Sequence, residues 1–560
     1  MNQGAMLNAY PDSLGGKLSD IVLLLERDEC KNAFKSFYIL PSVFDTDLDR
    51  GFSVISYDLN HRFTSRDDIE RLQKNGIDLK LDFILNHLSV LSPQFQDILK
   101  NGRESQYWDF FIDWNAFWQG YGTMTEEGYI QPDSDAIKNM FFRKPGLPLL
   151  MVRLPDGTSA PFWNTFYQQV KYDPVDAQTI MHAAGLQYAE SDLLAQRIND
   201  ALSQGITPAK IDLSDFADKR DCIIDMLEQR RKYLGQMDLN LNSDQVWQYY
   251  AQTLARLAEY GASIVRLDAF AYAAKAPGKR NFLNEPETWD TLERVRSMAQ
   301  QYNVELLPEI HASYSEGTYK KLSDMGYATY DFFLPGLLID AIENCDGTTL
   351  CTWAREVYQN KIRTVNMLGC HDGIPLLDLK GLIPEERIQQ LIDLIVSRGG
   401  MIKNLHGQKN VYYQVNATYY SALGEDDRKL LLSRAIQLFM PGKPQVWYLD
   451  LFAGKNDTVA VARGGAAGHK EINRTNLSKS DIEERLKWPV VRTQLDMLRA
   501  YNSCPAFDEN AEFILNQPSQ STLEFHWQAN GAKADLYVDL KSISFRMNVE
   551  TPDGEYRLNQ

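Results

Sequence analysis

Charged and polar residues follow four apolar stretches of the sequence, at the point where each stretch ends. These polar groups lie in residues 82–87, 266–268, 309–311 and 371–372. A charge at the end of an apolar strand costs free energy unless it is paired or functional. A structural ion pair explains a single case, whereas four successive cases at the same end indicate a catalytic site.

Asp268 and Glu309 are the two carboxyl groups best suited to glycoside chemistry. Retaining glycoside cleavage uses two carboxyl groups about 5–5.5 Å apart, and neighbouring strands lie roughly 4.8 Å apart. Arg266 shares a strand face with Asp268, so we expect it to keep that carboxylate ionised. Glu309 must start protonated to act as an acid, so we expect burial and nearby negative charge to raise its pKa. Further candidates for binding sugar hydroxyls are Asp372, His87 and His371.

The strands that must position these groups repeat along the chain. Short apolar runs alternate with helical patterns, which predicts successive βα units. The expected strands are 6–10, 36–41, 79–86, 263–270, 305–310, 328–334, 364–370 and 445–449. Eight parallel strands close a barrel whose interior is filled by side chains, and active sites lie at the carboxyl ends of its strands. The predicted fold class is therefore α/β, a (β/α)₈ TIM barrel with inserted domains and a small C-terminal β domain.

Two long gaps and a change of pattern near the C-terminus predict the additional domains. Turn sequences such as Asn530-Gly531 mark the C-terminal β segment. The expected divisions are the barrel in 1–86, 236–373 and 431–504, an inserted domain in 87–166, an extra helical insertion in 167–235, a loop-rich insertion in 374–430 and the β domain in 505–560.

Composition excludes several classes of protein. The chain has 560 residues and a formal charge of 58 − 75 = −17. This balance argues against non-specific binding to nucleic acid or anionic membranes, which attract basic surfaces. The six cysteines form no Cys-x-x-Cys pair or zinc-like cluster. We see no signal peptide and no apolar run of about 18 residues, and therefore expect a soluble cytoplasmic protein. A homodimer is one assembly that the sequence leaves open.

The polar segments together resemble the signature segments of the α-amylase clan of glycoside hydrolases. Longer segments are similar to the sucrose phosphorylases: 266–272, 308–311, 371–374, 414–423, 444–448, 453–457 and 471–474. The resemblance covers almost the whole chain except about 167–235. It implies that Asp268 is the nucleophile, Glu309 the acid/base and Asp372 the transition-state stabiliser.

The resemblance also implies a substrate site. The residues that would hold the glucosyl ring are Asp49, His87, Arg266, His371 and Arg474. Phe52 and Tyr272 would flank the ring, with Phe166 at the entrance. The acceptor and phosphate would be bound by Gln236, His311 and two mobile loops that contain Arg143-Lys144 and Tyr413-Gln414.

Three features depart from the family pattern. Val411-Tyr412-Tyr413-Gln414 stands where Asp-Leu-Tyr-Gln is usual, so a polar contact to fructose is lost. Lys144 stands where the family often has arginine, and a lysine binds phosphate with less fixed geometry. The helical insertion has no counterpart. Its simplest interpretation is a surface decoration, and the alternatives are a lid over the acceptor site or an oligomer contact.

The activity implied by the resemblance is reversible phosphorolysis of sucrose to α-glucose 1-phosphate and fructose through a β-glucosyl-enzyme. No cofactor, metal, nucleic acid or membrane partner is expected. Alternatives are a related phosphorylase acting on sucrose 6′-phosphate, glucosylglycerol or glucosylglycerate, and an α-glucosidase or transglucosidase. Tyr413 favours unphosphorylated sucrose, since relatives that prefer the 6′-phosphate tend to have His there. A non-catalytic sugar-binding protein is disfavoured because all three carboxylates are present.

Overall fold

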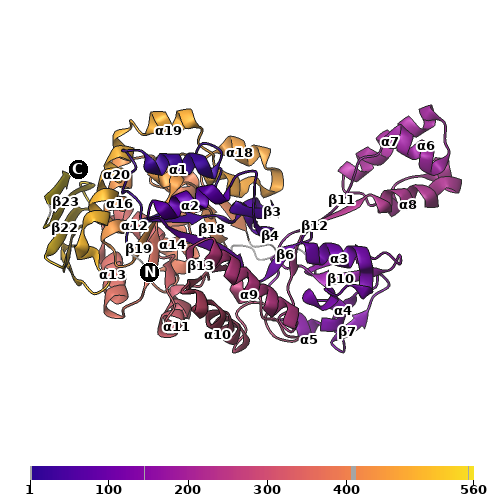
Figure 1. Ribbon diagram of the computed structural model, residues 1–560, viewed down its shortest axis with the longest axis horizontal. Coiled ribbons are helices and arrows are strands. Elements are labelled where there is room, and N and C mark those ends of the chain that lie inside the picture. Colours follow the sequence, from indigo (N-terminus) through magenta and orange to yellow (C-terminus); the bar gives the residue numbers. More distant parts are fainter. Residues whose placement is uncertain (1–2, 144–145, 405–411, 553) are drawn as a thin grey trace. The chain divides into compact units, whose positions relative to one another are not determined.

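The computed structural model of the chain describes residues 3–143, 146–404, 412–552 and 554–560. The chain forms two compact units (Figure 1). The first comprises Met1–Asn86, Asp135–Pro145 and Leu241–Gln560, and the second comprises His87–Ser134 and Gly146–Asn240.

The first unit is built on a ring of eight parallel strands. They are β1 (Met6–Ala9), β2 (Ser36–Ile39), β5 (Asp78–Ile84), β13 (Ala262–Asp268), β14 (Glu305–Pro308), β15 (Thr329–Asp331), β16 (Thr364–Met367) and β19 (Lys443–Trp447). Their hydrogen-bonded order is β14-β13-β5-β2-β1-β19-β16-β15, and the first and last of these strands also touch. The predicted (β/α)₈ barrel is confirmed, and the ends of each strand lie within about three residues of their predicted positions.

Helices connect the strands and cover the barrel. They include α1 (Leu18–Glu26), α2 (Arg66–Lys74), α9 (Asp244–Glu259), α10 (Glu287–Ala299), α11 (Thr318–Asp324), α12 (Leu334–Asn344), α13 (Thr348–Gln359), α16 (Asp427–Phe439) and α20 (Pro489–Ser503). Helix α9 buries an apolar stripe that runs from Val246 to Leu257. Gly261 ends this helix at φ +85°, a backbone conformation that favours glycine.

The segment after the seventh barrel strand is more ordered than its loop-rich composition predicted. It contains a 3₁₀ helix η10 (Leu376–Leu379), the helix α14 (Glu385–Ser397), the antiparallel pair β17 (Met401–Asn404) and β18 (Tyr412–Asn416), and α15 (Tyr419–Ala422). Helix α14 buries four aliphatic side chains at helical spacing, at positions 388, 391, 392 and 395. This periodicity indicates a helix, but the polar residues around it led to a loop-rich interpretation of the segment.

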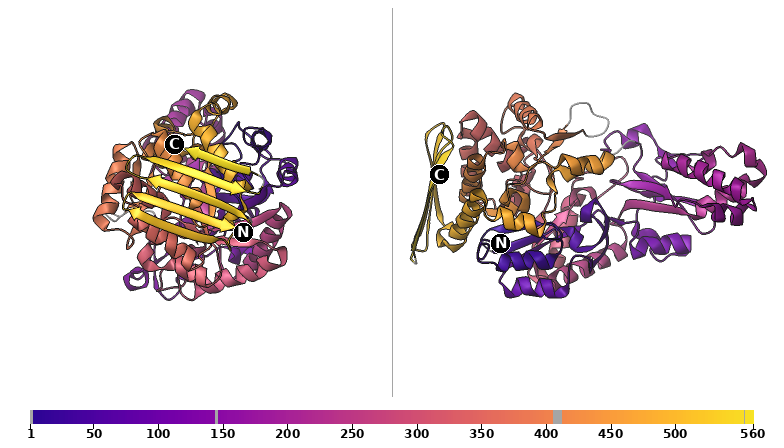
Figure 2. Two further views of the ribbon diagram at one scale, coloured as in Figure 1. Left: turned by 90° about the vertical axis from the view of Figure 1, so that its left-hand side faces the viewer. Right: turned by 90° about the horizontal axis from the view of Figure 1, so that it is seen from above.

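The C-terminal β domain is a five-stranded antiparallel sheet, as predicted. Its strands are β20 (Glu512–Ser519), β21 (Thr522–Ala529), β22 (Ala532–Asp539), β23 (Ser544–Thr551) and β24 (Gly554–Asn559). Asn530 and Gly531 both have positive φ, which suits the tight hairpin between β21 and β22. Figure 2 shows the sheet flat against the barrel helices, where it contacts α13, α16 and α20.

The second unit contains a small aromatic core and short strands. Its elements include β6 (His87–Ser89), α3 (Pro93–Asn101), α4 (Trp114–Phe117), β7 (Gly122–Met124), β8 (Ile130–Pro132), β9 (Leu149–Arg153), β10 (Ser159–Trp163), β11 (Gln168–Tyr172) and β12 (Arg231–Asp238). Trp163 packs on Trp114 and Trp118 with ring centroids 4.9 and 6.0 Å away. Residues 236–240, which we expected to open the second part of the barrel, belong to this unit because β12 pairs with β6.

A helical insertion lies between β11 and β12. Its helices are α6 (Ala177–Ala184), α7 (Tyr188–Ser203) and α8 (Arg220–Gln229) (Figure 1). They share a buried cluster drawn only from this insertion, including Ile180, Leu194, Ile198, Ile223 and Leu227. The helical part is therefore shorter than the expected 167–235, since both ends of that range are strands.

We expect the helical insertion to be removable. Tyr172 and Arg231 already pair directly across β11 and β12, so an Asn-Gly turn in place of residues 173–230 can close the hairpin. The shortened protein should unfold within a few degrees of the parent in a thermal melt. Ile198→Ala in the full chain is the matched control: it should loosen only the insertion, seen as faster proteolysis there, with a local cost of about 2–5 kcal/mol. Insoluble or unfolded protein after the deletion would contradict this independence.

None of the helices within the described ranges combines the length and apolar character needed to cross a membrane.

Candidate active site

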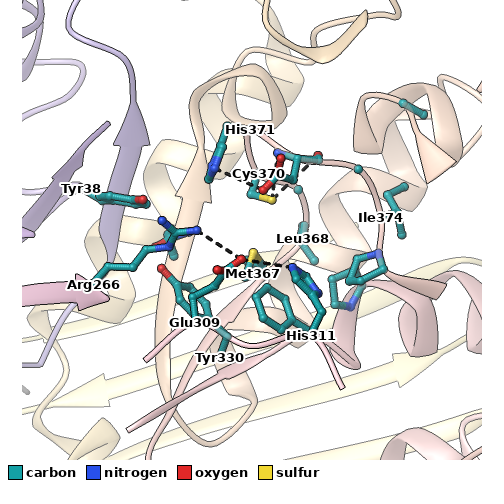
Figure 3. Close-up of a pocket in the computed structure, with 18 residues that line it drawn as sticks. Tyr38, Arg266, Glu309, His311, Tyr330, Met367, Leu368, Cys370, His371 and Ile374 are labelled. Atoms are coloured by element: carbon teal, nitrogen blue, oxygen red, sulfur yellow. Dashed lines mark hydrogen bonds and ion pairs between the residues drawn. The ribbon is translucent and has the colours of Figure 1, made fainter. Parts of the chain in front are cut away.

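The expected catalytic carboxyl groups converge at the carboxyl ends of the barrel strands. Asp268 is the last residue of β13, and Glu309 follows β14 directly. The backbone N–H of Glu309 donates to the carbonyl of Leu267 at 3.2 Å, which ties the two strand ends together. Asp372 follows β16 and lines the same pocket as Glu309. Figure 3 shows Glu309 in this pocket, together with Arg266, His311 and His371.

Arg266 links three of the carboxylates. Its Nη1 lies 2.6 Å from Asp82 Oδ1 and 2.8 Å from Asp268 Oδ1, and its Nη2 lies 3.3 Å from Glu309 Oε1. The side chain is only 3% exposed. The Tyr38 hydroxyl also donates a hydrogen bond to Asp82 Oδ1 at 3.0 Å, which helps to hold that carboxylate in place. The guanidinium therefore holds together acids from three neighbouring strands, β5, β13 and β14.

The pKa values of the pair differ from the expectation drawn from sequence. Burial raises the pKa of Asp268 to about 7, and nearby Glu309 adds to the effect although Arg266 opposes it. Burial also acts to raise the pKa of Glu309, but Arg266 and His311 outweigh it and lower that pKa to about 2. The difference arises because sequence spacing assigned Arg266 to Asp268 alone and did not reveal the second cation on Glu309.

That second cation is His311. Its Nε2 lies 3.3 Å from Glu309 Oε1, and its Nδ1 lies 3.0 Å from Asp378 Oδ2 on η10. Phe332 stacks on the imidazole with ring centroids 4.0 Å apart. Burial lowers the pKa of His311, but Asp378 and Glu309 together raise it to about 10. His311 was predicted from the sequence but Asp378 was not, because Asp378 follows the His371-Asp372 motif by six residues and belongs to no charge pattern of its own.

A second group of charges surrounds Asp372. Lys470 Nζ lies 3.5 Å from Asp372 Oδ1 and 3.1 Å from Asp49 Oδ2, and Arg474 contacts the same two acids at 3.7 and 3.5 Å. Burial opposes ionisation, but the nearby cations Lys470 and Arg474 hold the pKa of Asp372 well below its usual range. Lys470 was not predicted as a site residue, although it lies four residues before Arg474, a spacing that places side chains on one helix face.

His371 contributes as a neutral ring. Burial, helped by nearby cations, lowers its pKa to about 3. Its Nε2 lies 3.3 Å from Asp372 Oδ2, and its ring stacks on Phe52 at 4.9 Å between centroids. Phe52 also lies under the Arg266 guanidinium, 5.6 Å from its carbon. These contacts place the predicted aromatic residue Phe52 between the His371 ring and the Arg266 guanidinium.

The expected acceptor residues of the first unit are partly described. Arg143 Nη1 donates to the Tyr272 hydroxyl at 2.7 Å. Gln414 accepts from the Gly373 N–H at 3.1 Å, and its Nε2 lies 3.4 Å from His311 Nε2. Lys144 and the side chain of Tyr413 lie outside the described residues.

Three predicted site residues belong to the second unit. The His87 and Phe166 rings lie 5.1 Å apart. Gln236 on β12 pairs with Ser89 on β6 and accepts from the Tyr167 N–H at 3.2 Å. These residues form one group within that unit.

The barrel, with paired carboxyl groups and a third acid at its strand ends, defines an enzyme class that transforms glycosides. The chain is 48% identical over 555 residues to the sucrose 6(F)-phosphate phosphorylase of Ilumatobacter coccineus, covering 97% of this chain and 95% of the relative. It is 28% identical to the sucrose phosphorylase of Streptococcus mutans, covering 97% and 96%.

The crystal structure of a related protein also matches this chain. Sucrose 6F-phosphate phosphorylase from Thermoanaerobacter thermosaccharolyticum matches with a TM-score of 0.81 at 30% identity, covering 100% of this chain and 98% of that one. No protein-family model matches the chain. The chain belongs to the sucrose phosphorylase family of the α-amylase clan and is an enzyme of the disaccharide phosphorylase kind, acting on small molecules.

Lys470→Met should move the acid limb of activity to higher pH. Lys470 is among the charges that lower the pKa of both Asp49 and Asp372, so its loss lets these groups take up protons at higher pH. We expect kcat/KM to fall about tenfold near pH 5, and less near pH 7. Lys455→Met is the control, because Lys455 pairs with Glu425 at an exposed position. An unshifted acid limb would exclude this role for Lys470.

Proposed function

We propose that the enzyme catalyses reversible phosphorolysis of sucrose 6F-phosphate to α-glucose 1-phosphate and fructose 6-phosphate. The observation that carries this proposal is the 48% identity, over 97% of the chain, with a relative named for that substrate. The sequence favoured sucrose and gave the 6′-phosphate as an alternative, and the identity with this relative supports the alternative.

Charge in the acceptor segments supports the phosphorylated substrate. Val411 stands where the family usually has an aspartate, and the Arg143-Lys144 segment supplies two cations. An acid beside an incoming phosphate monoester repels it, whereas cations attract it. Losing the acid while retaining the cations therefore favours fructose 6-phosphate over neutral fructose as the leaving group.

Sucrose itself is the second candidate. Tyr413 occupies the position at which relatives preferring the 6′-phosphate tend to have His. The relative from Streptococcus mutans is named sucrose phosphorylase. A donor comparison separates the two candidates.

We assign Asp268 as the nucleophile that attacks the anomeric carbon and Glu309 as the acid that protonates the leaving oxygen. Phosphate then attacks the β-glucosyl-enzyme on the same face, with Glu309 as the base, and two inversions give net retention. The support is their position on neighbouring strand ends, joined through Arg266. Asp372, Asp49 and Arg474 would bind the sugar hydroxyls.

We also place the enzyme in the cytoplasm. The six cysteines at positions 30, 222, 345, 351, 370 and 504 are free thiols. Free thiols suit a reducing compartment.

The donor comparison is a direct test of the acceptor. With inorganic phosphate present, glucose 1-phosphate should be released from sucrose 6F-phosphate with kcat/KM at least about tenfold above that for sucrose. Asp268→Asn is the control for release at this site. A preference for sucrose would support the second candidate, and free glucose as the main product would support a hydrolase.

Substituting the proposed nucleophile and the proposed acid should affect turnover in different ways. Asp268→Asn should abolish turnover of every donor, because no nucleophile remains. Glu309→Gln should reduce turnover of sucrose 6F-phosphate by at least about a hundredfold but largely spare glucosyl-enzyme formation from α-glucosyl fluoride, whose leaving group needs little acid help. Rapid-quench measurement of both donors checks this. Equal losses on the two donors would remove Glu309 from the acid role.

A further inference from the structure

Asp378, His311 and Glu309 form a continuous line of ionisable side chains that reaches the proposed acid. Nδ1 of the central imidazole lies 3.0 Å from Asp378 Oδ2, and its Nε2 lies 3.3 Å from Glu309 Oε1. The side chains of Asp378 and His311 are each 6% exposed, and that of Glu309 is 14% exposed. Charges in such a buried arrangement interact more strongly than they would in water.

The proposed reaction leaves one proton unaccounted for. Glu309 must carry a proton when the leaving oxygen departs, yet Arg266 and His311 favour its ionised form in the free enzyme. Of these two cations, Arg266 does not release a proton in proteins. His311 is therefore the contacting cation that can supply one.

We propose that His311 delivers its Nε2 proton to Glu309 when the donor binds, and that Asp378 is the positioning residue that keeps His311 doubly protonated until then. The inference rests on the proposed acid role of Glu309. The Nε2–H bond breaks and leaves its electron pair on nitrogen, while an O–H bond forms on the Glu309 carboxylate. His311 becomes neutral and keeps its Nδ1–H on Asp378, so the net charge of the three groups stays at −1.

The cycle closes in the second half of the reaction. Glu309 gives the proton to the departing oxygen, and later takes one from the attacking phosphate. Returning that proton to His311 Nε2 restores the starting state. Each half-reaction thus uses the same short path, and atoms and charge balance without an additional reactant.

The charges around this line favour the starting state. His311 faces Asp378 and Glu309 directly, with the Gln414 amide 3.4 Å from Nε2 and the Phe332 ring on its face. Glu309 also faces Arg266 and feels Asp372 and Asp268. Asp378 feels Glu316 in addition to His311. Among the charges that hold the imidazole protonated, Asp378 is the strongest.

Asp378→Asn tests the inference through the pH dependence of turnover. Without the carboxylate, burial should dominate and His311 should lose its proton at lower pH. We expect kcat/KM for sucrose 6F-phosphate to fall at least about tenfold near pH 8 but to stay close to the parent near pH 5.5, so that the basic limb moves down by at least about one pH unit. Glucosyl-enzyme formation from α-glucosyl fluoride should stay within about threefold of the parent.

Two controls separate positioning from a purely structural role. Asp378→Glu restores a carboxylate and should recover part of the basic limb. Asp393→Asn makes the same chemical change at an exposed site on α14 and should leave the profile unchanged. A folded Asp378→Asn variant with the parent profile, or with equal losses at every pH and on both donors, would overturn the inference.

The Glu309→Gln variant distinguishes failure of the inference from failure of the proposed acid role. If the path runs through Glu309, adding Asp378→Asn to Glu309→Gln should cause no further loss on sucrose 6F-phosphate. If Glu309→Gln has the activity of the parent, both the acid role of Glu309 and proton delivery from His311 are contradicted. If Glu309→Gln is impaired while Asp378→Asn behaves like the parent, only proton delivery from His311 is contradicted.

A measurement on the parent covers the case in which Asp378→Asn does not fold. The chain has only eight histidines, so imidazole ¹⁵N labelling gives few NMR signals, and the His311→Gln variant identifies those of His311. Both ring nitrogens should be protonated near pH 7.5, about one unit above the ordinary histidine pKa. A neutral ring at that pH would overturn the inference.

Discussion

The buried guanidinium of Arg266 is the interaction on which the rest of the site depends. Removing a cation from water is costly, and here three carboxylates within 3.3 Å offset that cost. The arrangement is reciprocal, because each acid is ionisable in the interior only while the cation is present. Breaking it would leave several uncompensated charges, so the barrel register at β5, β13 and β14 and the chemistry are fixed by the same contact.

A second set of cations organises the other side of the pocket. Lys470 and Arg474 hold Asp49 and Asp372 ionised, and His371 stays neutral between them and Arg266. The acids of the site thus fall into two groups with different electrostatic environments. One group is held firmly ionised, as suits binding of sugar hydroxyls. In the other group, the pKa values of Asp268 and His311 are raised and that of Glu309 is lowered.

The barrel that holds the catalytic groups and the helical insertion have separate hydrophobic cores. The barrel and its C-terminal sheet form one unit with a continuous set of packed strands and helices, and the helical insertion has a hydrophobic core of its own. An insertion with its own core adds little constraint to the strands that hold Arg266. This explains why a family pattern could be read through almost the whole chain while residues 167–235 remained without a counterpart.

The sequence by itself determined the barrel and the residues at its strand ends. An apolar run that stops at Asp268 or Glu309 is a local pattern, and hydrophobic burial translates it directly into a strand with a polar end. It also determined the C-terminal sheet, through alternation and the Asn530-Gly531 turn. Tertiary structure alone decided the partners of each charge. Asp378 lies 67 residues from His311, and Lys470 lies 421 residues from Asp49. A pKa depends on burial and on every charge nearby in space, so the protonation of Asp268 and Glu309 followed from packing that no local spacing encodes.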